Sequence, residues 1–152
     1  MAYDLLVQHG RIVDGSGMPS FFGDVAINNG KIAAIGKLGS TATRVIDADG
    51  MVIAPGFVDN HCHYDAQVLW DPLCSFSCYH GATTVIIGNC SLALAPVRPG
   101  AAERVSEFLS YVEAIPMDVL RTLDFSWETI PQYMDTLEPR LGVNVGTLIG
   151  HS

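Results

Sequence analysis

The chain has 152 residues, of which 49% are hydrophobic and 16% are charged, and its mean hydropathy is +0.29. This composition predicts a folded globular protein and excludes a disordered chain. The formal net charge is −8, with 8 basic residues against 16 acidic ones, and the basic residues form no cluster. We therefore expect neither nucleic acid nor an anionic membrane as a partner.

No segment of the sequence is typical of an export signal or a membrane span. The first ten residues contain Asp4, and they lack both a basic leader and a continuous apolar stretch. The longest uncharged stretch, residues 72–97, is interrupted by prolines and glycines. Four cysteines in such a chain are typical of thiols or metal ligands rather than disulfides. We expect a cytoplasmic protein.

Residues 1–54 consist of short β-type runs separated by turn residues. The runs are Asp4–Gln8, Arg11–Asp14, Asp24–Ile27, Lys31–Ile35 and Arg44–Ile46. Turns such as Asn29-Gly30 and Asp49-Gly50 between short β runs are typical of hairpins. We therefore expect a small antiparallel element of β-sandwich type over residues 1–54, too thin to enclose a core by itself.

From Pro55 onwards the pattern changes to that of an α/β protein. Apolar, β-branched runs without strict alternation occupy residues 56–60, 83–87 and 143–149, as in parallel strands that are buried on both faces. Helices are predicted between them, over residues 72–80 after Asp71, over residues 101–114, and over residues 127–137 after Ser126. The order of elements predicts about three parallel βα units over residues 55–152.

Side chains that can bind a metal follow each of the three predicted parallel strands. His61 and His63 follow the first strand, Cys90 follows the second, and His151 follows the third. Enzymes with parallel sheets build their sites at these carboxyl ends. Because side chains alternate along a strand, we expect His61 and His63 to share one face while Cys62 points to the other. Two imidazoles on one face can chelate a divalent ion.

The segments 55–59 and 61–65 resemble the first barrel strand of the amidohydrolase superfamily, and the preceding β-element fits that superfamily. Further segments resemble the N-acyl-D-amino-acid deacylase branch, which contains the D-aminoacylase-like enzymes. These segments are 64–67, 70–72, 80–85, 88–90, 95–100, 108–116 and 150–152. The resemblance covers essentially the whole chain. It implies the N-terminal portion of a TIM-type (β/α)8 barrel, with about three of the eight units present.

The resemblance also implies a metal centre that holds one or two divalent ions. His61 and His63 would belong to it, and Cys90 would be a zinc ligand in place of the carboxylated lysine of many other amidohydrolases. A thiolate suits zinc because it is a strong, soft ligand. The branch usually has glycine at the position of Ser91, so we expect an altered loop if that glycine serves a positive φ.

Three further residues are candidates for a role beside the metal. Asp65 is a candidate for orienting a ligating histidine. Arg98 is a candidate for binding a substrate carboxylate, and the alternative is a structural arginine in its loop. His151 is a candidate for contact with a ligand residue or the substrate, and the alternative is a histidine that merely ends a strand. The resemblance places a general acid/base aspartate and two more histidine ligands beyond Ser152.

The implied function is zinc-dependent hydrolysis of the linear amide bond of a small-molecule N-acyl-D-amino acid. We expect this chain to be inactive by itself. A second hypothesis is a cyclic amidohydrolase of hydantoinase or dihydroorotase type, which Cys90 disfavours because those enzymes normally use a bridging lysine. A third is a truncated, non-catalytic domain that associates with a partner, or with itself, through exposed sheet edges.

Overall fold

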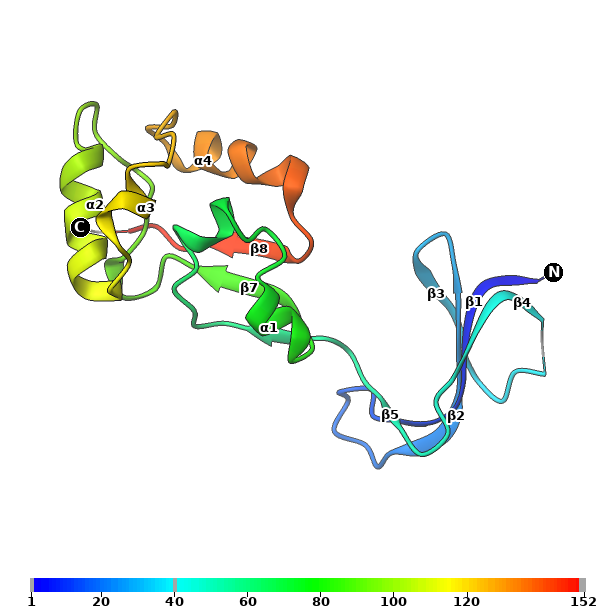
Figure 1. The fold of residues 1–152 in the computed structure, drawn as a ribbon. Coiled ribbons are helices and arrows are strands. Elements are labelled where there is room, and N and C mark those ends of the chain that lie inside the picture. Colours follow the sequence, from blue (N-terminus) through cyan, green and yellow to red (C-terminus); the bar gives the residue numbers. More distant parts are fainter. Residues whose placement is uncertain (1, 40, 151–152) are drawn as a thin grey trace. The chain divides into compact units, whose positions relative to one another are not determined.

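The computed structural model describes residues 2–39 and 41–150 and divides the chain into two compact units, Met1–Pro55 and Gly56–Ser152 (Figure 1). The first unit contains a five-stranded sheet. The second contains a three-stranded sheet with helices in its connections. Each unit therefore has its own hydrogen-bonded framework.

The sheet of the first unit is mixed. Its strands are β1 (Tyr3–Ile12), β2 (Phe21–Asn28), β3 (Lys31–Gly36), β4 (Ala42–Asp47) and β5 (Val52–Ile53). The antiparallel prediction holds for β1, β2 and β3, whereas β4 and β5 pair with β1 in parallel. In the strand order β3-β2-β1-β4, β3 and β4 lie at opposite edges of these four strands. The chain therefore crosses over from β3 to the other side of β1, and such a crossover allows β4 to pair with β1 in parallel. These strands form one sheet, and the described residues of the unit contain no second sheet of a sandwich.

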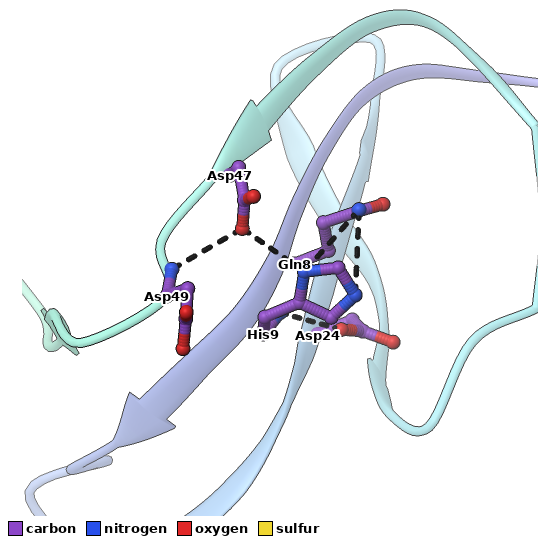
Figure 2. A network of polar contacts seen from close by, with 5 residues as sticks. All are labelled: Gln8, His9, Asp24, Asp47 and Asp49. Carbon is purple, nitrogen blue, oxygen red and sulfur yellow. Dashed lines mark hydrogen bonds and ion pairs between the residues drawn. The ribbon is translucent and has the colours of Figure 1, made fainter.

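A β-bulge at His9 explains why two predicted β runs form the single strand β1. The pairing with β2 shifts register between Val7 and Gly10, and His9 has a φ of 65°. The backbone N–H of His9 donates to Oδ1 of Asp24 at 3.0 Å, and its Nδ1 lies 2.9 Å from Oδ1 of Asp47 (Figure 2). Because Asp24 and Asp47 lie on β2 and β4, the bulge is connected to both neighbouring strands.

The second unit is built on the predicted parallel sheet. Its strands are β6 (Phe57–Asp59), β7 (Ala82–Ile87) and β8 (Asn144–Thr147), in the order β6-β7-β8. Both strand pairs are parallel, which confirms the prediction of βα units. The central strand β7 is the best buried, since Val85 and Ile87 are fully buried. The carboxyl ends of the three strands therefore meet at one edge of the sheet.

Helices fill the connections between these strands. They are η1 (Gln67–Leu69) and α1 (Ser75–Tyr79) before β7, then η2 (Asn89–Ser91), α2 (Ala102–Glu113), α3 (Met117–Leu120), α4 (Ile130–Leu137) and η3 (Glu138–Arg140) before β8. The prediction for α2 is confirmed, and α3 was not predicted. Helix α1 begins three residues later than predicted, and the carboxylate of Asp71 accepts hydrogen bonds from both the backbone N–H and the hydroxyl of Ser75. The described part of the chain contains no helix long and apolar enough to cross a membrane.

Helix α4 also begins later than predicted, because Trp127 is a core residue of the preceding loop. The Trp127 indole is buried and donates to the carbonyl of Leu94 at 2.8 Å. The N-cap is Thr129 rather than Ser126, and Thr129 and Gln132 form a reciprocal capping box. The buried Tyr133 ring packs against Trp127 with ring centroids 5.1 Å apart. These contacts fix α4 against the loop that follows β7.

Candidate metal centre

Three side chains that can bind a metal converge at the carboxyl ends of β6 and β7. The ligand atoms of His61, His63 and Cys90 all lie within 4.8 Å of one another. Sγ of Cys90 is 3.4 Å from Nε2 of His61, and the two imidazoles stack with centroids 5.5 Å apart. The convergence follows from the topology, because β6 and β7 are parallel neighbours and release the chain at the same edge.

The histidines lie in the loop after β6 rather than on the strand itself. Strand β6 ends at Asp59, so strand alternation alone does not fix the directions of His61 and His63. Between them, Cys62 is half-buried, and its thiol donates to the carbonyl of Ile86 at 3.3 Å. Burial raises the pKa of this thiol to about 11. Cys62 is thus tied to β7, and it is outside the cluster of His61, His63 and Cys90.

The loop that carries Cys90 is held in an unusual backbone conformation. Gly88, Cys90 and Ser91 have φ values of 81°, 56° and 62°, all in the left-handed region. A Cβ atom at position 88 would lie 2.6 Å from the carbonyl oxygen of Leu148, so only glycine fits there. Ser91, where the sequence analysis expected an altered loop, adopts a positive φ, the conformation that glycine favours. The turn directs Cys90 back towards His61.

Asp65 supports this loop. Its carboxylate is buried, and Oδ2 accepts a hydrogen bond from the backbone N–H of Gly88 at 3.0 Å. The second oxygen, Oδ1, has no hydrogen-bond partner among the described residues. Burial disfavours the charged form and raises the pKa of Asp65 to about 6. Asp65 is therefore hydrogen-bonded to the loop that carries Cys90, and no hydrogen bond among the described residues joins its carboxylate to His61 or His63.

A glutamate that the sequence analysis missed takes the position beside the histidine. Oε1 of Glu113, the last residue of α2, lies 2.7 Å from Nδ1 of His63. Both side chains are about three-quarters buried, with 22% of Glu113 and 28% of His63 exposed. The two residues are 50 positions apart, so no local motif joins them. One signal in the sequence could have indicated a role for Glu113: it is an acid at the C-terminus of a predicted helix, where the helix dipole disfavours a negative charge.

The remaining candidates are not part of the cluster of His61, His63 and Cys90, or lie outside the described residues. Arg98 is exposed and lines a cleft of about 810 Å³ together with Arg104 and apolar residues of α2. The lining of this cleft includes Ser91, next to Cys90 in the chain. His151 lies outside the residues that the structure describes.

The donor set fits a zinc ion. Zinc binds cysteine sulfur at about 2.3 Å and imidazole nitrogen at about 2.0–2.1 Å, usually with tetrahedral geometry. These bond lengths place neighbouring ligand atoms about 3.4–3.6 Å apart. The separation of 3.4 Å between Cys90 and His61 matches this value, and the limit of 4.8 Å for the whole cluster requires only small side-chain movements. Two imidazoles and one thiolate leave a fourth position open.

Comparison with known proteins defines the family. The model of the amidohydrolase family matches residues 44–152, so the chain belongs to that family. An uncharacterised protein of Mycobacterium bovis is 38% identical over 159 residues, which cover 100% of this chain and 26% of that protein. D-aminoacylase of Alcaligenes xylosoxydans xylosoxydans is 33% identical over 156 residues, covering 99% of this chain and 29% of the enzyme.

A solved structure agrees with these relatives. The crystal structure of N-acyl-D-glutamate deacylase from Bordetella bronchiseptica, complexed with zinc and a phosphonate mimic of the tetrahedral intermediate, superposes with a TM-score of 0.79 at 33% identity. The match covers 99% of this chain and 30% of that one. The chain thus spans between 26% and 30% of the length of these proteins.

Proposed function

We propose that this chain is the N-terminal part of a zinc-dependent amidohydrolase that removes the acyl group from N-acyl-D-amino acids. The observation that carries the proposal is the convergence of His61, His63 and Cys90 within 4.8 Å at the carboxyl ends of two parallel strands. The deacylase relatives support the choice of substrate class. Small-molecule N-acyl amino acids are therefore the proposed binding partners.

The proposed roles follow from the chemistry of the side chains. His61 and His63 offer neutral imidazole nitrogens, and Cys90 offers a thiolate, as one or two zinc ions require. Bound zinc would polarise the acyl carbonyl and lower the pKa of a bound water to about 7. Asp65 holds the Cys90 loop through the N–H of Gly88. Proton transfer at the reacting water is assigned to an aspartate outside these 152 residues.

We further propose that the 152-residue chain does not turn over substrate by itself. A complete barrel of this type has eight βα units, and the described residues form three parallel strands of one. Two additional histidine ligands are also assigned to sequence outside this chain. Hydrolysis of N-acetyl-D-amino acids by the isolated chain, abolished by Cys90→Ala, would refute this part of the proposal.

A cyclic amide hydrolase of hydantoinase or dihydroorotase type is the competing enzymatic function. The two functions differ in substrate, so an assay of a longer protein that includes this chain separates them. We expect hydrolysis of N-acetyl-D-amino acids, no hydrolysis of their L enantiomers, and no opening of hydantoin or dihydroorotate rings. Ring opening without deacylation would reverse the assignment.

Metal binding by the chain itself is the direct test of the proposed centre. Cobalt(II) is the suitable probe, because a thiolate ligand gives an intense sulfur-to-cobalt charge-transfer band in the near ultraviolet. We expect this band on titration of the chain, and we expect zinc to displace the cobalt. The band should disappear in Cys90→Ala.

Cys78 provides the matched control for that titration. Like Cys90 it is an exposed free thiol, but it lies outside the cluster. Cys78→Ala should leave both the band and the affinity unchanged. The proposed centre is wrong if the wild-type chain binds no metal above background, or if Cys90→Ala binds it as well as the wild type.

We also propose that the protein works in a reducing compartment, the cytoplasm. Cys62, Cys74, Cys78 and Cys90 are all free thiols, and the proposed chemistry requires Cys90 as a thiolate. Mass spectrometry after alkylation of freshly lysed cells tests this location. Four alkylated cysteines per chain are expected, whereas a disulfide in the native protein would contradict it.

A further inference from the structure

The contact between Glu113 and His63 brings a carboxylate to the metal-ligand cluster from a different element. Glu113 is the last residue of α2, whereas His63 lies in the loop after β6. Their side chains meet at 2.7 Å, the short distance of a charge-assisted hydrogen bond. Partial burial of both groups protects this bond from competing water.

The contact determines which nitrogen of His63 is available to a metal. Nδ1 faces Glu113, so in the neutral ring the proton resides on Nδ1 and Nε2 keeps its lone pair. In the neighbouring His61 it is also Nε2 that approaches Sγ of Cys90. With its proton on Nδ1, His63 would offer a metal the same ring nitrogen as His61.

The position of Glu113 is not explained by its own helix. The C-terminus of a helix carries partial negative charge, which makes a glutamate in the last residue unfavourable. The following residue, Ala114, adopts a left-handed φ of 54° without being glycine. By contrast, Glu103 in the first turn of α2 suits the dipole and pairs with Arg121. The contact with His63 compensates for this unfavourable position, as is common where a local preference is broken at a functional site.

We infer that Glu113 is a positioning residue that holds His63 in the Nδ1–H tautomer and thereby directs Nε2 to the metal. The inference rests on the proposed metal centre. It adds that α2, which supplies no ligand, determines how well the ligands in the loops after β6 and β7 bind the metal. Loss of such a carboxylate partner typically lowers metal affinity about 10–100-fold.

The first experiment reads the tautomer without any metal. Long-range ¹H–¹⁵N correlation spectra of the metal-free chain, recorded at mildly alkaline pH where imidazole is neutral, distinguish Nδ1–H from Nε2–H rings. We expect His63 to be Nδ1–H in the wild type and in Glu113→Gln, which keeps an acceptor oxygen. We expect a shift to the Nε2–H form in Glu113→Ala. His63→Ala assigns the signals.

The second experiment measures zinc affinity by competition with a chromophoric chelator. Glu113→Ala should bind zinc 10–100-fold more weakly than the wild type, and Glu113→Gln should fall between them. Glu107→Ala is the matched control, because Glu107 is an exposed acid on the same helix, and it should bind like the wild type. Circular dichroism of each variant verifies that the fold is retained.

The outcomes separate this inference from the function on which it rests. A wild-type His63 in the Nε2–H form overturns the role of Glu113, whether or not the chain binds zinc. Equal zinc affinity of the wild type and Glu113→Ala, within twofold, overturns it as well. A chain with the Nδ1–H tautomer and no zinc binding instead refutes the proposed metal centre and leaves the hydrogen bond established.

Discussion

The carboxylate of Asp65 accepts a hydrogen bond from the backbone N–H of Gly88 at 3.0 Å, and it thereby joins the segment after β6 to the loop after β7. The proposed metal ligands lie on both sides of this bond, with His63 two residues before Asp65 and Cys90 two residues after Gly88. The spacing between the two ligand-bearing segments is therefore set by a buried polar contact.

Removal of the Asp65 carboxylate should destabilise the second unit. Asp65→Ala leaves the N–H of Gly88 without its acceptor in a buried site, which costs about 1–3 kcal/mol. Asp65→Asn keeps an acceptor oxygen and should lose less. Chemical denaturation with tryptophan fluorescence measures the difference, since Trp127 is buried in this unit. An Ala variant as stable as the wild type would show that this bond contributes nothing to folding.

Tyr133 provides a second attachment of the same segment. Its hydroxyl donates to the backbone carbonyl of Asp65 at 2.6 Å, and the residue is fully buried. Tyr133→Phe keeps the ring against Trp127 and removes only this bond, so the free energy of unfolding should fall by about 1–2 kcal/mol. Tyr111→Phe, on an exposed position of α2, is the control and should have no effect. Equal midpoints for the two variants would contradict the prediction.

Because the backbone at Ser91 is left-handed, we expect glycine at this position to give a more stable protein than alanine. For a residue with a Cβ atom, this conformation costs about 1–2 kcal/mol. Glycine avoids that cost, but part of the gain is cancelled because glycine loses more conformational entropy on folding. Ser91→Gly should therefore be about 1 kcal/mol more stable than Ser91→Ala. The comparison with alanine removes the hydroxyl from both variants and isolates the backbone effect. If alanine proves as stable as glycine, position 91 is not strained.

The bulge in β1 predicts a pH-dependent contact in the first unit. The hydrogen bond to Asp47 raises the pKa of His9 above its ordinary value of 6.5 (Figure 2). The folded state thus binds this proton more tightly than the unfolded state, so the contribution is complete below pH 6.5 and is lost as the pH rises through the higher folded-state pKa. An NMR titration of the His9 ring should show the raised pKa, and Asp47→Asn should lower it. If His9 titrates identically in the wild type and in Asp47→Asn, Asp47 is not the cause of the raised pKa.

The edges of the parallel sheet predict association of the isolated chain. In the described residues β6 and β8 each pair on one side only, and Phe57 and Val58 on β6 are more than 60% exposed. Open apolar edges of this kind recruit other strands. Light scattering should report a mass that rises with concentration, and Val58→Lys should reduce it. Tyr111→Lys, on a helix, should not. A chain that stays monomeric at all concentrations contradicts the prediction.

The sequence was sufficient to predict those features that depend on local pattern. The apolar runs located β6, β7 and β8, and parallel pairing then brought His61, His63 and Cys90 to one edge. The same information did not reveal Glu113, because its contact with His63 spans 50 residues and depends on how α2 packs. The N-cap of α4 was misplaced for a related reason, since burial of Trp127 outweighed its fit to the helical pattern. Packing decided both cases.

The long connection between β7 and β8 also delays the pairing of these two strands during synthesis of the chain. Thr84 on β7 pairs with Asn144 on β8, 60 residues later, and all of α2, α3 and α4 lie between them. At a synthesis rate of about 5–20 residues per second, the edge of β7 waits roughly 3–12 s for its neighbour. During that interval the strand that supports Cys90 has no partner on this side.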